Sequence, residues 1–100
     1  MAKLYISEYN SMGHGYNGSV SGALEPSLVE QTPVVIGAGS LQSAAFSAGT
    51  RIVRIHTDAI CSIAFGANPT ATVNSKRMEA NRTEYFSVVV GQRVAVIANT

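Results

Sequence analysis

Short apolar runs rich in β-branched residues, each ended by a turn residue, are the feature that most restricts the fold of this chain. Val, Ile, Thr and aromatic residues recur in stretches that Gly, Pro, Asn or Asp interrupts about every eight to twelve residues. The 3.6-residue periodicity of amphipathic helices is nearly absent. The pattern predicts an all-β fold, and 100 residues correspond to a single domain over residues 1–100.

The spacing of these runs predicts about eight short antiparallel strands. Their expected ranges are Lys3–Tyr9, Val34–Ile36, Leu41–Ser47, Arg51–Thr57, Ile60–Gly66, Arg77–Glu79, Glu84–Val90 and Arg93–Ala98. Without crossover helices, so many strands are accommodated most economically in a β-sandwich or a closed barrel. We expect a β-sandwich or jelly roll with one long loop or arm, Ser11–Thr32, in the N-terminal half.

Two turns predict how strands are connected. Gly91 is the first residue of a two-residue loop between Val90 and Arg93, which suits a type II′ turn, so the last two strands are expected to pair antiparallel. Asp58 lies in the turn between two further strands. We expect these strands to direct their apolar residues inward together, either through a longer turn or because they belong to facing sheets.

The predicted core consists of the apolar residues at inward strand positions. These are Leu4, Ile6, Ile36, Phe46, Val53, Ile55, Cys61, Ile63, Phe65, Phe86, Val88, Val94 and Val96. Burying such side chains is the main source of stability for a domain of this size.

His56, Asp58 and Cys61 form the only arrangement that resembles a nucleophilic triad. However, Cys61 alternates with Ile63 and Phe65, which is typical of a small buried apolar side chain. In that interpretation His56 lies on the outer face of its strand, and a single hairpin offers neither a cleft nor an oxyanion hole. The sequence therefore predicts a buried, unreactive Cys61 in a protein that is not an enzyme.

Other chemical signatures are missing from the sequence. The two His and one Cys match no metal-site spacing, and no cofactor is expected. The formal charge of +1 gives no field that would attract nucleic acid. No apolar stretch approaches the roughly 20 residues of a membrane helix, and no apolar segment of a secretory signal begins the chain. We expect synthesis in the cytoplasm and neither a membrane nor a nucleic-acid partner.

Charge is unusually sparse. Charged residues make up 13% of the chain, against about 25% in an average soluble protein. Since permanent interfaces are depleted of charge, this composition favours an assembly component that associates with itself as a dimer or trimer. The segment from Tyr9 to Gly22 is expected to contact a partner, through Tyr9, Met12, His14 and Tyr16.

The C-terminal half carries a resemblance. Its runs are Thr50–Asp58, Cys61–Gly66, Asn68–Thr72, Ala80–Val88 and Gly91–Ile97. This order resembles the small virion proteins of tailed bacteriophages, which include capsid decoration or cement proteins. The resemblance implies a non-enzymatic, oligomeric β-sandwich that is made in the host bacterial cytoplasm, binds the major capsid protein and stabilises the outside of the head.

A function of another class is a free carbohydrate-recognising β-sandwich module. Such modules usually present aromatic side chains to the sugar, and this chain has four tyrosines and no tryptophan. Three of the tyrosines, Tyr5, Tyr9 and Tyr16, lie in or beside the N-terminal arm, where they are equally suited to a protein partner.

Overall fold

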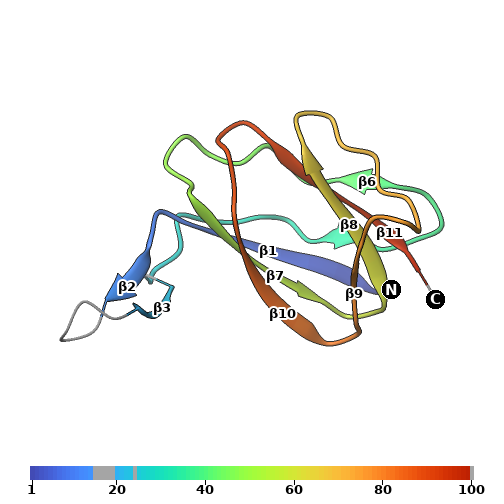
Figure 1. Cartoon of the computed structure of the whole chain (residues 1–100), viewed down its shortest axis with the longest axis horizontal. Helices are drawn as coiled ribbons and strands as arrows, with labels where there is room; N and C mark the ends of the chain where they lie inside the picture. Colours follow the sequence, from blue (N-terminus) through green and yellow to red (C-terminus); the bar gives the residue numbers. More distant parts are fainter. Residues whose placement is uncertain (15–19, 24, 100) are drawn as a thin grey trace.

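Two antiparallel sheets packed on one another form the body of the protein in the computed structural model, which describes residues 1–14, 20–23 and 25–99 (Figure 1). Eleven strands are present in this part of the chain. They are β1 (Lys3–Tyr9), β2 (Met12–His14), β3 (Val20–Ala23), β4 (Val29–Glu30), β5 (Val34–Val35), β6 (Leu41–Gln42), β7 (Ile52–Thr57), β8 (Cys61–Gly66), β9 (Lys76–Met78), β10 (Arg82–Ser87) and β11 (Arg93–Ala98). The predicted all-β sandwich is confirmed.

The first sheet has the order β10-β7-β1-β4, and β5 also pairs with β1. The second has the order β6-β11-β8-β9. At the centre of the first sheet, β1 pairs with β7 from Leu4 opposite Thr57 to Tyr9 opposite Ile52. Strands β2 and β3 pair with each other outside both sheets. In the described part of the chain, no helix has the length and apolar character needed to cross a membrane.

The core lies between the two sheets. Along β7, Val53, Ile55 and Thr57 are buried and alternate with partly buried residues, as expected of a strand with one face on the core. Every residue of the predicted core belongs to the buried cluster or packs against it. The cluster also contains Val34 and Met78, which the prediction left out.

Strands β7 and β8 belong to facing sheets. This is the second of the two alternatives for the turn at Asp58. Because the chain crosses from one sheet to the other, both strands direct their apolar residues to the same core, and Cys61 and Ile55 are both fully buried.

The predicted antiparallel pair of the last two strands is wrong. β10 pairs with β7 in the first sheet, whereas β11 lies between β6 and β8 in the second. The turn between them is still tight, with the Gln92 amide donating to the Val89 carbonyl at 3.2 Å. Gly91 has a φ of 82° at the third position of this turn, as in a type II turn, instead of the first loop position of a type II′ turn.

The Ser11–Thr32 region, predicted to be irregular, contains β2, β3 and β4. β2 and β3 form an arm that projects from one end of the sandwich (Figure 1), with a register shift between Gly13 and His14. β4 returns to the body and pairs with β1. The prediction of a long loop was therefore wrong for these residues, although that of an arm agrees with the projecting hairpin.

The segment 67–75 covers part of the outer face of the second sheet. Ser62 and Ala95, at outward positions of β8 and β11, are nevertheless fully buried, and Ala71 of the segment is buried as well. The Asn99 side-chain amide donates to the Ser62 hydroxyl at 2.7 Å and to the Val73 carbonyl at 3.1 Å. The small side chains of Ser62 and Ala95 leave room for the segment 67–75, so this segment already covers that part of the outer face.

Candidate functional site

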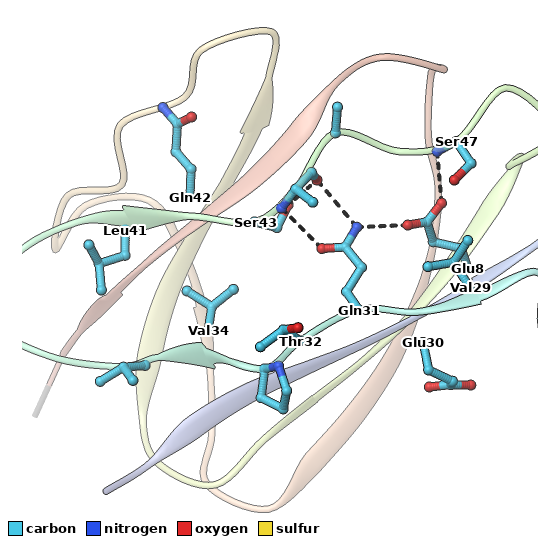
Figure 2. Close-up of a pocket in the computed structure, with 14 residues that line it drawn as sticks. Glu8, Val29, Glu30, Gln31, Thr32, Val34, Leu41, Gln42, Ser43 and Ser47 are labelled. Carbon is cyan, nitrogen blue, oxygen red and sulfur yellow. Dashed lines mark hydrogen bonds between the residues drawn. The ribbon is translucent and has the colours of Figure 1, made fainter.

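A groove of about 660 Å³ runs along the open side of the sandwich, between residues 29–35 of the first sheet and residues 41–47 beside the second (Figure 2). Gln31 crosses this groove. Its side-chain oxygen accepts a hydrogen bond from the Ala44 amide at 3.1 Å, and its nitrogen donates to the Ala44 carbonyl at 3.2 Å. The side chain of Gln31 thus makes the two bonds that a neighbouring strand would otherwise make.

Glu8 lies at the floor of the groove with only 1% of its surface exposed. Its carboxylate accepts hydrogen bonds from the Ser47 amide at 2.8 Å, the Thr50 hydroxyl at 2.6 Å and the Gln31 side-chain nitrogen at 2.7 Å. Burial raises the pKa of Glu8, but these hydrogen bonds outweigh it and hold the pKa below its ordinary value. Since its polar groups satisfy one another, we assign this groove a structural role, the closure of the sandwich edge.

A second, shallower pocket of about 390 Å³ lies on the outer face of the first sheet. It is lined by Tyr5, Ser7, Glu30, Arg54, His56 and Asp58. The pairing explains the depression, because the small side chain of Ser7 lies opposite Glu30 on one side and Arg54 on the other. Larger side chains therefore surround a short one at the middle of the sheet.

The polar groups of this outer pocket are only partly used within the chain. Glu30, which points away from the groove in Figure 2, accepts hydrogen bonds from the hydroxyls of Ser7 and Ser27. Asp58 accepts one from the Lys3 amide at 3.2 Å. Among the described residues, Arg54 has no hydrogen-bond or ion-pair partner. This pocket, unlike the groove, has polar groups available to a ligand.

His56 and Tyr5 form the aromatic side of the outer pocket. They lie opposite one another on β7 and β1, with ring centroids 6.2 Å apart and planes at 50°. A hydrogen bond of 2.8 Å joins His56 Nδ1 to the Thr83 hydroxyl oxygen. The outward position predicted for His56 is confirmed.

The three residues of the triad-like arrangement are separated by the fold. Cys61 is fully buried on the inner face of the second sheet, whereas His56 faces outward from the first. Asp58 is exposed in the turn. The first sheet lies between the imidazole and the thiol, so the two do not form a nucleophile and its base.

The Cys61 thiol is expected to be unreactive in the folded protein. Burial raises its pKa, and a hydrogen bond with Thr57 offsets this only in part, so little thiolate is present at neutral pH. A thiol reagent should label Cys61 only as fast as the protein unfolds, whereas Ser87→Cys, at an exposed position of β10, should add a rapidly labelled thiol. Rapid native-state labelling of Cys61 itself would contradict this.

Replacing the buried thiol tests its contribution to packing. Cys61→Ala should lower the free energy of unfolding by about 1–2 kcal/mol.

Three of the four expected partner contacts, Tyr9, Met12 and His14, are found at and beside the β2–β3 arm. Tyr9 is only 3% exposed, and its hydroxyl donates to Glu25 at 2.8 Å, which ties the two ends of the arm together. Burial and the Glu25 carboxylate raise the pKa of Tyr9 to about 12. Met12 is partly buried in β2, where the backbone of His14 pairs with Val20. Tyr16 lies outside the described residues.

No cluster of three or more His, Cys, Asp or Glu side chains suited to a metal ion occurs within residues 1–14, 20–23 and 25–99. The chain matches no protein-family model, no curated protein and no solved structure.

Proposed function

We propose that this chain is a capsid decoration protein of a tailed phage, a non-enzymatic component of the virion. In this proposal it binds the outside of the head and stabilises contacts between major capsid subunits. The observation that carries the proposal is the β2–β3 arm. The molecule measures 45 × 25 × 22 Å, and the arm extends along its longest axis (Figure 1). An arm of this kind reaches beyond the footprint of the body, so one copy can contact two neighbouring subunits.

The arm is well suited to bind a protein strand. Its base is fixed by the Tyr9–Glu25 hydrogen bond and by Asn10, whose side chain donates to the Gly49 carbonyl at 3.0 Å. Among the described residues, β2 and β3 pair only with each other, which leaves an open edge on each. Open edges present unpaired amide and carbonyl groups that an extended partner segment can bind.

The remaining surface also supports a role in assembly. The one ion pair of the described residues joins Arg77 and Glu79, both about half exposed. Large apolar side chains are exposed at several separate places, including Leu28, Val73 and Val89. Burying such a surface against other subunits costs little free energy, because few charged groups have to be removed from water. For the same reason the proposal includes a dimer or trimer.

Self-association through β10 is disfavoured by its own sequence. β10 is an edge strand, and Arg82 and Glu84 lie opposite Thr57 and Ile55, on the inner side of the sheet, where both side chains are still exposed at its edge. Charged side chains at inward positions of an edge strand oppose pairing with a second edge. We therefore expect copies to meet through another surface.

The test is co-sedimentation with bare tailed-phage heads, assembled from major capsid protein without a decoration protein. Wild-type protein should pellet with the heads and raise the temperature at which they break. A variant with residues 12–23 replaced by Gly-Ser should remain folded, with an unchanged circular dichroism spectrum, but bind at least about tenfold more weakly, since its strand edges are lost. Asn74→Ser, an exposed polar position on the segment that covers the second sheet, is the control and should bind normally.

Two outcomes contradict the proposal separately. If wild-type protein does not pellet at any concentration, attachment to the head is wrong. Should the arm variant pellet as well as wild type, the arm is not the contact. Saturable binding to a glycan without affinity for heads would favour the free carbohydrate-recognising module.

A further inference from the structure

The outer pocket of the first sheet keeps opposite charges apart beside an exposed aromatic ring. Glu30 and Arg54 both flank Ser7, yet they form no ion pair with each other. From this arrangement we propose that the pocket binds a neutral, hexose-based oligosaccharide. The site is built by β1, β4, β7 and the turn after β7, and it does not depend on the proposed attachment to a phage head.

Sugar hydroxyls match the polar groups that the pocket leaves available. The Arg54 guanidinium has five N–H donors, and the carboxylates of Glu30 and Asp58 keep acceptor positions beyond the hydrogen bonds they already accept. Each hydroxyl both donates and accepts a hydrogen bond. Neighbouring hydroxyls on one pyranose ring can therefore accept from Arg54 and donate to a carboxylate at the same time, which a purely cationic or purely anionic ligand cannot do.

The aromatic side supplies the apolar contact. Tyr5 is 39% exposed, so a large part of its ring is open to solvent. It is tilted against His56, which fixes its orientation over the pocket. The C–H face of a pyranose is apolar and can pack against such a ring while its hydroxyls reach the polar side.

Charge and size restrict the ligand further. Two carboxylates against one guanidinium make the lining net negative, which disfavours sialylated or sulfated sugars. The volume of about 390 Å³ lies within the range of small-molecule pockets. Because the pocket is shallow, single sites are expected to bind weakly, and multivalent presentation of the glycan should strengthen binding.

The first experiment is an array of neutral hexose oligosaccharides printed beside sialylated and sulfated ones, probed with wild-type protein. We expect binding to a subset of the neutral glycans. The best of them is then titrated into isotope-labelled protein, with amide resonances as the readout. Shifts should be concentrated in residues 5–7 and 54–58. This mapping uses the unaltered protein, so it does not depend on any variant being folded.

Variants then identify the contacts. Arg54→Ala and Tyr5→Ala should each weaken binding by about tenfold or more, as expected for the loss of a charged hydrogen-bonding group or an aromatic contact. Tyr85→Ala is the matched control, since Tyr85 is an exposed tyrosine on the same face that does not line the pocket, and it should change affinity less than about twofold.

Three results would overturn the inference. The first is that wild-type protein binds no neutral glycan on the array better than the Arg54→Ala variant does. The second is that wild-type protein prefers acidic glycans. The third is that the resonance shifts lie away from the pocket. None of these measurements involves attachment to the head. A negative result for glycan binding therefore does not contradict the capsid proposal, and a negative co-sedimentation result does not contradict glycan binding.

Discussion

Glu8→Ala is expected to lower the free energy of unfolding by about 2–4 kcal/mol, because it removes the carboxylate that three donors share, one of which, the Thr50 hydroxyl, is fully buried. These donors are the Ser47 amide, the Thr50 hydroxyl and the Gln31 side-chain nitrogen. The loss also removes one of the three hydrogen bonds that hold the Gln31 side chain across the groove. Urea unfolding measures the change. Glu84→Ala, at an exposed position of β10, is the control and should change stability by no more than about 0.5 kcal/mol.

The pH dependence of stability separates the contribution of the Glu8 charge from that of the shape of its side chain. Since the folded protein holds the pKa of Glu8 below its ordinary value of 4.5, the carboxylate stabilises the fold fully above that pH. This stabilisation is lost as the pH falls through the lower pKa of the folded state. Glu8→Gln removes the titrating group and should show a smaller loss of stability over the same pH range. Equal acid sensitivity of the two proteins would contradict the assignment.

Ile55→Ala should cost about 2–5 kcal/mol, which is the usual range for a large cavity in a packed core. Ile55 is fully buried at the middle of β7, where its strand has partners on both sides. His56→Ala is the control at the next residue, because its side chain faces outward, and it should cost far less. Comparable losses for the two variants would mean that the alternation of β7 is not as described.

Alternation along the sequence was sufficient to predict most strands and nearly all of the core. β1 and β11 have the predicted bounds, and β7 and β8 differ by one residue at their starts. The reason is physical, since a strand with one buried face has a period of two that any register must respect. The same alternation contains a signal for Glu8, which follows Leu4 and Ile6 at the next inward position of β1.

Strand partners were harder to predict because local sequence leaves them open. Gly91 accepts a positive φ at either central position of a tight turn, so Val90–Arg93 is compatible with a hairpin and with a crossing between sheets. The pairing of β10 with β7 decides between the two, and that pairing involves residues about 30 positions apart. β4 was not predicted for a similar reason, because its two residues are held in place mainly by pairing with β1.

The outer pocket could not be predicted from the sequence of any single strand. The outward placement of His56 follows from alternation, and Arg54 is two residues away on the same strand. Tyr5 and Ser7 come from β1 and Glu30 comes from β4, so the site exists only once the register of three strands is known. The separation of His56 from Cys61 likewise required the knowledge that their strands are in different sheets.

The strand order has a consequence for how the protein folds during its synthesis. β1 is made early, but its long pairing partner β7 is made only after a further 42 residues, from 10 to 51, have been added. The second sheet is completed later still, since β11 lies between β6 and β8 and is made after every other described strand. Contacts so distant in sequence slow folding. We therefore expect the growing chain to remain without a complete core, and to rely on protection from aggregation, until Ala98 has been added.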